Sequence, residues 1–589
     1  MCGIAGYVGR RNAPVLLFDM LERLEYRGYD SAGVMFIERG KIRIIKDKGK
    51  VREVRARVKP ENYSSTIGVA HTRWATHGIP SRVNAHPHMD CKGLFAVSHN
   101  GIIENYSNLK KELIAKGHTF KSDTDTEVIS HLMEEHYQGD VIKAFRKTLG
   151  VLEGSYALAV LCVKEPDRIL IARKDSPLIV GLGNGENFIA SDAPAFLPYT
   201  KRILILSDLE YGVVDKDKVE IFSLSSGKAI KRKAESICWD IKEAEKSGYH
   251  HFMLKEIMEE PEAAANALKS SKELRRIALR LKGKKRIYFI ACGTAYHAGL
   301  AAKYMLESFG IPAEAAVASE FRYSTAGTLD KSCGLILVSQ SGETADTIAA
   351  GKAARQKGAY VAGIVNVVGS TITRIANDTA YTHSGPEISV ASTKAYVGQL
   401  VALAQLSLYL AAERGKIGRK ELCRLEQELG KTPKRIRNIL AGNRIKELAE
   451  ECADKKTLFY IGRNVNYPTA LEGALKLKEI TYLHAEGYAA GELKHGPIAI
   501  LDRDVVVIAI KSGGLLDDKM DSNIQETRAR QAKVIIVAED GGMKVPQVEP
   551  LFTPIVNIVP LHLFAYYVSV LKGLDPDKPR NLAKSVTVE

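Results

Sequence analysis

The sequence lacks the features that mark several specialised classes of protein. Its eight cysteines include no CxxC pair, so we expect neither a disulfide framework nor a zinc ribbon at this length. Its start has no basic segment followed by an apolar run, so we expect no signal peptide. The longest apolar stretch, 401–412, is interrupted by Gln405 and Ser407 and is too short to span a bilayer. These absences predict a cytoplasmic protein and a buried helix at 401–412.

The charge balance is basic, but no nucleic-acid motif accompanies it. Lys and Arg number 84 and Asp and Glu 69, which gives a net charge of +15. The basic clusters Arg275–Arg286 and Lys431–Arg437 lie in stretches of helical periodicity, so we interpret them as solvated helix faces. A polyanionic partner is the alternative. Because helix-turn-helix, RNA-binding and zinc-finger patterns are missing, we expect small-molecule substrates and no nucleic-acid or membrane partner.

The order of apolar segments divides the chain into two parts. The first 240 residues mix short strands with a few helical stretches, which indicates an α+β domain. After a charged stretch at 238–248, strands alternate with helices, which predicts parallel, doubly wound sheets. The alternation restarts after Lys455, so we expect a structural repeat of two α/β units. Strands are predicted at 286–291, 334–339, 360–367, 457–461, 504–510 and 533–537.

Cys2 is a candidate nucleophile. Removal of Met1 would leave a thiol and a free α-amine on the same residue. An α-amine with a pKa of about 7.7–8.0 can take the thiol proton without a second side chain. Taken alone, however, Cys2 fits a small buried apolar residue better.

Polar groups elsewhere in the first part favour the catalytic interpretation. The Asn100 amide and the Gly101 backbone N–H follow a predicted strand and can form an oxyanion hole. Arg73 can bind a carboxylate in a bidentate manner, and Asp125 can hold an ammonium group. An amino-acid substrate needs one group of each charge.

The first part resembles the class II glutamine amidotransferases, which are N-terminal-nucleophile hydrolases with an αββα fold. The motifs that carry the resemblance are CGIAG at 2–6, YRGYDSAG at 26–33, HTRWATHG at 71–78, HNG at 99–101 and SDTDTE at 122–127. The resemblance implies Cys2 as the nucleophile and Asn100 with Gly101 as the oxyanion hole.

The same resemblance assigns the glutamine pocket. It implies that Arg73 binds the glutamine carboxylate and Asp125 its ammonium group. Thr76 and His77 would line the pocket, and Trp74 would gate the passage of ammonia. Two pairs of neighbouring histidines could suggest a metal site: His86 with His88, and His250 with His251. Since no carboxylate or cysteine lies at ligand spacing from them, we predict packing or surface roles and no metal.

The second part contains a candidate phosphate site. Ser339-Gln340-Ser341-Gly342-Glu343-Thr344 lies between a strand end and a helix start, where free N–H groups and the helix dipole attract a phosphate. An ordinary hydroxyl-rich helix cap is the alternative. The lack of a GxxxxGK[ST] motif argues against a nucleoside triphosphate.

Charged residues also recur on one helical face. Glu472, Lys476 and Glu479 are spaced by four and three residues. Surface ion pairing and a lined pocket are both compatible with this spacing.

The second part resembles a tandem pair of SIS domains, and the whole chain resembles the isomerizing glutamine–fructose-6-phosphate aminotransferase family. SQSGETADT at 339–347 and PRNLAKSVTVE at 579–589 are its most specific motifs. The sugar-phosphate residues that the resemblance implies are Thr294, Ser339, Gln340, Ser341, Thr344 and Ser392, with Glu472 and Lys476 nearby. Ala295 departs from the serine common in the family, which puts one hydroxyl contact in doubt.

The family also implies catalytic roles in the second part. Lys584 would form a Schiff base with the ketose, and Glu479 would move a proton between C1 and C2. His495 would assist ring opening from the neighbouring subunit of a homodimer. No metal or organic cofactor is implied. The expected domains are glutaminase 2–240, linker 241–274, SIS domains 275–430 and 445–574, and a catalytic tail 575–589.

Three other functions are weighed against this one. A sugar-phosphate deaminase or isomerase would not need Cys2, Arg73 and Asp125. A sugar-phosphate sensor would not need Lys584 or Glu479. An amidotransferase that makes phosphoribosylamine or asparagine would carry a pyrophosphate or ATP motif, and the second part has none.

Overall fold

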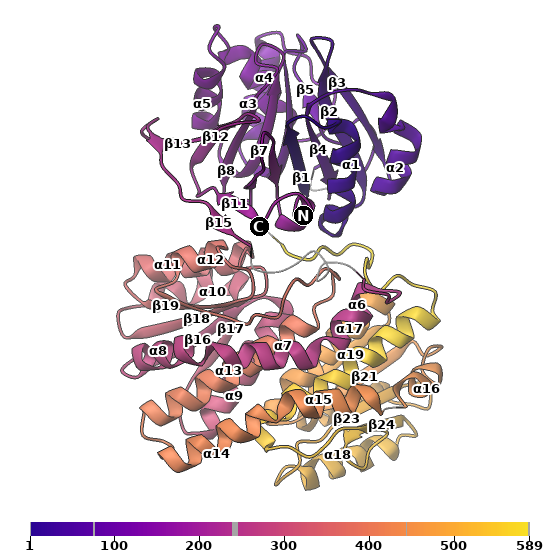
Figure 1. The fold of residues 1–589 in the computed structure, drawn as a ribbon. Coiled ribbons are helices and arrows are strands. Elements are labelled where there is room, and N and C mark those ends of the chain that lie inside the picture. Colours follow the sequence, from indigo (N-terminus) through magenta and orange to yellow (C-terminus); the bar gives the residue numbers. More distant parts are fainter. Residues whose placement is uncertain (1, 75–76, 238–245, 443, 587–589) are drawn as a thin grey trace. The chain divides into compact units, whose positions relative to one another are not determined.

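The computed structural model describes residues 2–74, 77–237, 246–442 and 444–586. The chain forms two compact units (Figure 1). The first unit consists of residues 1–244 and 583–589, and the second of residues 245–582.

The first unit is built on two antiparallel sheets. Its strands are β1 Gly3–Val8, β2 Ser31–Glu38, β3 Lys41–Lys48, β4 Ile67–Arg73, β5 His88–Met89, β6 Phe95–Ile103, β7 Gly154–Cys162, β8 Ile169–Lys174, β9 Ile179–Leu182, β10 Asn187–Ala190, β11 Arg202–Ile205, β12 Glu210–Val214, β13 Val219–Ser223, β14 Ala229–Ile230 and β15 Glu235–Ser236. The eight-stranded sheet has the order β15-β11-β9-β10-β1-β4-β2-β3. The seven-stranded sheet has the order β14-β13-β12-β8-β7-β6-β5.

Alternating side chains of these strands build four layers. Ile4 of β1 faces the apolar core between the sheets, whereas the next residue, Ala5, faces the helix α1. The helices are α1 Ala13–Leu24, α2 Val51–Val58, α3 Tyr106–Ala115, α4 Glu127–His136 and α5 Val141–Val151. Phe18 of α1 packs on the outer face of one sheet and Phe145 of α5 on that of the other (Figure 1). The predicted αββα arrangement is confirmed. It forms because strands whose side chains alternate between two apolar faces need cover on both sides.

The second unit contains two parallel sheets. Its strands are β16 Arg286–Ala291, β17 Glu314–Val317, β18 Cys333–Ser339, β19 Tyr360–Val365, β20 Asp378–Tyr381, β21 Thr457–Gly462, β22 His484–Ala489, β23 Val506–Ile510, β24 Lys533–Ala538 and β25 Met543–Lys544. The sheet orders are β17-β16-β18-β19-β20 and β22-β21-β23-β24-β25. Because the two orders correspond strand for strand, the predicted repeat is confirmed.

Helices cover both faces of these sheets. They are α6 Phe252–Met258, α7 Glu260–Ala267, α8 Ser271–Leu281, α9 Gly293–Ser308, α10 Ala318–Ser324, α11 Ala345–Gln356, α12 Thr371–Ile375, α13 Lys394–Glu413, α14 Arg419–Gly430, α15 Thr432–Ala441, α16 Ile445–Glu450, α17 Tyr467–Thr481, α18 Asp517–Arg528 and α19 Thr553–Leu571. One apolar cluster joins Phe289 of the first sheet to Leu458 of the second, so the two repeats share a core. Within the segment predicted as a linker, Met253 of α6 and Ala264 of α7 are buried in this core.

Two helices of the second unit are long and apolar enough to cross a membrane by length and composition alone. They are α13 and the helical segment Pro550–Leu571, which ends with α19. In the most apolar window of each, 94% and 83% of the residues are buried inside the protein, as in core helices. The buried helix predicted at 401–412 is therefore confirmed within α13.

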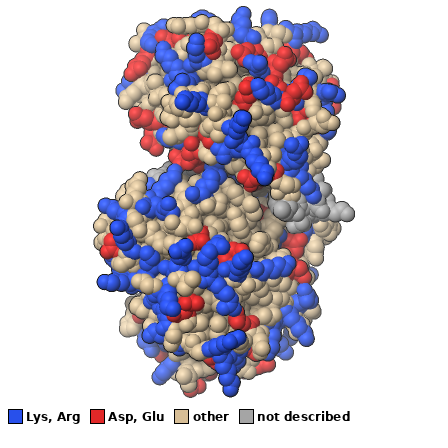
Figure 2. Space-filling view, turned by 60° about the vertical axis from the view of Figure 1, so that its left-hand side comes forward, with Lys and Arg blue, Asp and Glu red and all other residues tan. Residues whose placement is uncertain are grey.

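The basic clusters of the sequence are paired with acidic residues. Arg275 lies 2.5 Å from Glu426, and Arg437 lies 2.8 Å from Glu262. On the face shown in Figure 2, Lys and Arg side chains are interspersed with acidic ones. These pairs support the interpretation as solvated helix faces.

Candidate functional site

The first unit contains a pocket at the start of β1 and the end of β4. The residues that line it are Cys2, Arg73, Trp74, His77, His86, His99, Gly101, Thr124, Asp125 and Thr126. The fold thus brings together residues from four of the five motifs of the sequence. Thr76, predicted to line the same pocket, lies outside the described residues.

Cys2 directly precedes β1 and faces the backbone of Trp74. The Trp74 N–H donates to the Cys2 Sγ at 3.3 Å, and the thiol lies 3.5 Å from the Trp74 carbonyl oxygen. Burial raises the pKa of the Cys2 thiol. The resting thiol is therefore protonated near neutral pH, so nucleophilic attack requires a base.

Arg73 and Asp125 place opposite charges in the pocket. Arg73, at the end of β4, is 3% exposed and donates through Nη2 to the carbonyl oxygens of His77 and Gly78. Its buried Nη1 has no hydrogen-bond partner among the described residues, so it remains available to a ligand. The Asp125 Oδ2 accepts from the Ile103 N–H at 2.8 Å, which fixes the carboxylate before α4. This pair suits a substrate that carries both a carboxylate and an ammonium group.

Asn100 is held in a defined orientation by two residues that the sequence did not single out. Its Oδ1 lies 3.0 Å from His71 Nε2, and its Nδ2 donates to Ser191 Oγ at 2.8 Å. Nδ2 also donates to the Cys2 carbonyl oxygen at 3.0 Å. Since His71 Nε2 also faces the His99 carbonyl oxygen at 3.0 Å, it must carry the proton. The amide NH₂ is therefore directed to the Cys2 side.

Gly101 adopts a backbone conformation that only glycine takes readily. Its φ is +130°, and a Cβ added there would lie 2.1 Å from the Ser155 carbonyl oxygen. This conformation occurs inside β6, next to Asn100. The glycine is therefore required by close strand packing.

Three buried histidines around the pocket, His71, His86 and His99, are neutral near pH 7. Burial lowers the pKa of His71 to about 3 and lowers those of His86 and His99 below the usual range. His71 and His86 stack with ring centroids 4.1 Å apart, and His86 contacts His88 edge-on at 4.9 Å. The packing role predicted for His86 and His88 agrees with this stack.

In the second unit, the hydroxyl-rich turn forms a compact structure at the end of β18. Ser339 Oγ accepts from the Gly342 N–H at 3.0 Å and lies 3.1 Å from Thr344 Oγ1. Thr344 directly precedes α11, so the turn meets a helix N-terminus as predicted. Gln340 and Ser341 are partly exposed beside it.

Two charged residues of α17 are buried, which excludes surface ion pairing for them. Glu472 and Lys476 are 0% and 1% exposed, respectively. Lys476 Nζ lies 2.5 Å from Glu479 and 3.5 Å from Glu472. Burial opposes the charge on Lys476, but the two carboxylates outweigh burial and raise its pKa. Burial likewise opposes ionisation of Glu472, but Lys476 and His297 outweigh it and lower its pKa.

Glu472 connects α17 to the first repeat. Its Oε1 accepts from Thr294 Oγ1 at 3.0 Å, and its Oε2 lies 2.7 Å from His297 Nδ1. His297 was not predicted, although it lies one helical turn after Thr294 on α9. The partly buried Ala295 packs against the apolar core.

Ser392 is held by another unpredicted residue. Its Oγ donates to the Glu387 carboxylate at 2.8 Å, and the same carboxylate accepts from the Thr393 and Ala395 N–H groups. Glu387 is 4% exposed and caps the start of α13. No spacing in the sequence indicates this contact.

His495 and Lys584 are the two remaining residues for which catalytic roles are predicted. His495 is exposed at the end of the 3₁₀ turn η8 Ala490–His495. Lys584 is partly buried and belongs to the first unit, whereas Glu479 belongs to the second. The family's pairing of these residues stays a prediction.

Comparison with known proteins assigns both units. A glutamine amidotransferase domain matches residues 71–198, and a SIS domain matches residues 280–409 and 451–547. The glutamine–fructose-6-phosphate aminotransferase (isomerizing) of Pyrococcus horikoshii is 50% identical over 602 residues, and that of Aquifex aeolicus is 49% identical over 604. Both alignments cover 100% of each chain. The solved C-terminal domain of glucosamine-fructose-6-phosphate aminotransferase from Francisella tularensis is 36% identical, with a TM-score of 0.54, and covers 57% of this chain and 100% of that one.

Proposed function

Because the chain belongs to the isomerizing glutamine–fructose-6-phosphate aminotransferase family, we propose that its two units divide one reaction between them. The enzyme converts glutamine and fructose 6-phosphate to glutamate and glucosamine 6-phosphate. The glutaminase function is assigned to the first unit and the ketose-to-aldose conversion to the second. The observation that carries the proposal is the pocket that joins Cys2, Arg73 and Asp125.

The glutaminase step starts at Cys2. Arg73 and Asp125 hold the carboxylate and ammonium of glutamine, and the Cys2 sulfur attacks the side-chain amide carbon. Asn100 and the Gly101 N–H stabilise the oxyanion, while His77 and Thr76 line the pocket. Collapse of the intermediate gives a thioester and ammonia, and water then releases glutamate. The buried thiol supports the need for a base, a role that the α-amine of Cys2 fills once Met1 is removed.

Ammonia is used at the second unit. The Lys584 amine condenses with C2 of the open ketose and releases water. Ammonia, admitted past Trp74, displaces the lysine and leaves an imine on C2. Glu479 takes a proton from C1 and returns one to C2, which gives the aldose. Thr294, Ser339, Gln340, Ser341, Thr344 and Ser392 hold the phosphorylated sugar.

Buried charge supports the role of α17. Lys476 lies between two carboxylates and holds Glu479 through a 2.5 Å contact, so the Glu479 side chain has a fixed position. Glu472 extends the group to Thr294 in the first repeat. We further propose a cytoplasmic homodimer in which His495 opens the sugar ring of the neighbouring subunit. The proposed domains keep the boundaries 2–240, 275–430, 445–574 and 575–589.

Substitution of Cys2 separates the two half-reactions. Cys2→Ala should lower glutamine-dependent synthesis at least ~10³-fold, because the covalent intermediate cannot form. Synthesis from ammonium salts and fructose 6-phosphate should stay within about twofold of wild type. Product is measured by mass spectrometry. Cys423→Ala, at an exposed cysteine of the second unit, is the matched control. Full glutamine-dependent activity of Cys2→Ala would overturn the proposal.

A further inference from the structure

A group of metal-ligand side chains lies in the first unit, away from the pocket-lining residues. Cys91 follows β5, His118 follows α3, and His131 and Glu134 lie one turn apart on α4. One ligand atom from each residue lies within 4.8 Å of the others. Three segments far apart in the sequence therefore converge on one point.

Four of the distances between the ligand atoms are close to those of a tetrahedral zinc site. The Cys91 Sγ lies 3.8 Å from His118 Nδ1 and 3.6 Å from His131 Nδ1. Glu134 Oε2 lies 3.4 Å and 3.9 Å from the same two nitrogens. Zn–S and Zn–N bonds of about 2.3 and 2.0 Å at tetrahedral angles separate the ligand atoms by roughly 3.3–3.6 Å. Small side-chain shifts would close the difference.

The His118 and His131 side chains both direct Nδ1 towards Cys91 and Glu134. His118 Nε2 lies 3.4 Å from Glu135 Oε2, and His131 Nε2 lies 3.7 Å from Glu127 Oε1. Both Nδ1 atoms therefore face the Glu134 carboxylate and the Cys91 sulfur, which is the arrangement that a cation held between the four atoms requires. A carboxylate behind each metal-binding histidine is a recurring feature of zinc sites.

Burial and the types of ligand favour zinc. The His118, His131 and Glu134 side chains are 9%, 1% and 4% exposed, respectively. The Thr119 N–H donates to the Cys91 Sγ at 3.3 Å, and Cys91 itself is exposed. The second oxygen of the Glu134 carboxylate lies 3.2 Å from Lys92 Nζ, which leaves Oε2 directed to the two imidazoles. A set of one sulfur, two imidazoles and one carboxylate in tetrahedral arrangement is typical of zinc, not of calcium or magnesium.

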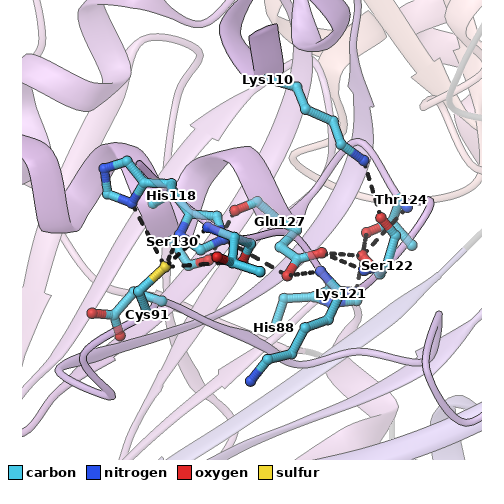
Figure 3. A network of polar contacts seen from close by, with 12 residues as sticks. His88, Cys91, Lys110, His118, Lys121, Ser122, Thr124, Glu127 and Ser130 are labelled. Carbon is cyan, nitrogen blue, oxygen red and sulfur yellow. Dashed lines mark hydrogen bonds and ion pairs between the residues drawn. The ribbon is translucent and has the colours of Figure 1, made fainter. Parts of the chain in front are cut away.

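The site is connected to the loop before α4. The Glu127 carboxylate, which faces His131, accepts from the Lys121 N–H at 2.9 Å and from the Ser122 N–H at 2.7 Å. Figure 3 shows Cys91 and His118 at one end of this network and Ser122 and Thr124 at the other. Ser122 Oγ lies 3.0 Å from Thr124 Oγ1, next to Asp125 in the chain.

We propose that Cys91, His118, His131 and Glu134 bind one Zn²⁺ ion that fixes the segment 118–127 against α4. The ion has a structural role and takes no part in the reaction. Through Glu127 it holds the loop that carries Asp125; this second consequence rests on the proposed function of Asp125. The expectation of no metal rested on the spacing around His86, His88, His250 and His251 and on the family's reaction, and it did not consider this group.

Metal content tests the site independently of activity. The full-length chain is purified without a metal-affinity tag, washed with a weak chelator and analysed by plasma mass spectrometry. We expect about one zinc per chain in the wild type and in Cys423→Ser, and less than a tenth of that in Cys91→Ser. His118→Gln is a second variant that leaves the thiol in place and should also lose the metal. Absence of zinc from the wild type, a different stoichiometric metal, or equal zinc in Cys91→Ser would contradict the proposal.

Cobalt replacement tests the ligands directly. Co²⁺ added to the metal-free wild type should give a thiolate-to-cobalt charge-transfer band and visible bands with the intensity of tetrahedral cobalt. Cys91→Ser should lose the charge-transfer band. Chelation should raise the KM for glutamine several-fold and leave ammonia-dependent synthesis unchanged. If the protein contains stoichiometric zinc but chelation leaves the KM for glutamine unchanged, the zinc site stands and its proposed link to Asp125 is wrong. A failure of the Cys2 test would leave the metal result untouched.

Discussion

At the scale of single residues, the first unit depends on buried groups that orient the reactive ones. His71 fixes the Asn100 amide, and its own proton position is set by two oxygen acceptors. The sequence predicted Asn100 from its place after a strand. It could not predict His71 or Ser191, because His71 on β4 and Asn100 on β6 belong to different sheets and Ser191 lies just after β10.

The buried His71 should make stability depend on pH. Its pKa is lowered to about 3 by burial, against about 6.5 in an unfolded chain, so unfolding takes up a proton between these values. The contribution to stability is present above pH 6.5 and is lost as pH falls towards 3. At pH 4.5 the loss should be about 2–3 kcal/mol relative to pH 7.

Urea unfolding at pH 7 and pH 4.5 measures this loss. His71→Gln keeps a donor for Asn100 but has no titratable group, so its stability should change less between the two pH values. His250→Gln, at an exposed histidine, should behave as the wild type does. An identical pH dependence for wild type and His71→Gln would contradict the assignment of this loss of stability to His71. His71→Gln should also preserve more glutaminase activity than His71→Ala, which removes the donor.

At the scale of elements, helix α17 is central to the chemistry proposed for the second unit. It carries Glu472, Lys476 and Glu479, and its glycine lets it approach the sheet closely. A Cβ added at Gly473 would lie 2.8 Å from Leu561 of α19 and 2.9 Å from the Tyr460 ring of β21. The helix and the i, i+4, i+7 spacing were predictable, since helical periodicity places these residues on one face. Burial of that face was not, because it depends on α9 and α19.

Gly473→Ala should therefore destabilise the second unit. Overpacking at this position should cost about 1–3 kcal/mol and lower ammonia-dependent synthesis by displacing Glu479. Gly430→Ala, on α14, is the matched control because nothing lies within 4 Å of its added Cβ. It should be neutral or stabilise by up to about 1 kcal/mol. Thermal unfolding of both variants provides the measurement, and equal melting temperatures would refute the close-packing argument.

At the scale of the whole molecule, two units with different folds serve one reaction. The first unit places its polar groups at strand ends of an antiparallel sandwich. The second places its hydroxyl-rich turn at the carboxyl end of β18, where open parallel sheets bind their ligands. The proposed sharing of His495 between subunits would be a property of the assembly, and it can be tested by mixing subunits.

Heterodimers of His495→Ala and Glu479→Gln subunits show whether His495 acts in the neighbouring subunit or in its own. If His495 serves the neighbouring subunit, one site of each heterodimer has both residues intact and the other has neither. Purified heterodimers, isolated through two different tags, should then show about half the wild-type rate of ammonia-dependent synthesis. If His495 acts within its own subunit, both sites lack one residue and the rate should stay near that of either variant alone.

The sequence by itself determined the two fold classes and the repeat, and it predicted the candidate site residues from ordered motifs. Strand and helix periods and short local motifs encode these features, and most predicted strands of the second unit agree with the structure to within two residues. The tertiary structure alone decided the contacts between distant segments. The His71–Asn100 contact, the Glu387 cap and the Cys91 group join residues from different strands and helices. Only the H-x-x-E spacing of His131 and Glu134 signalled the last of these, because the other two ligands depend on how β5 and α3 pack beside α4.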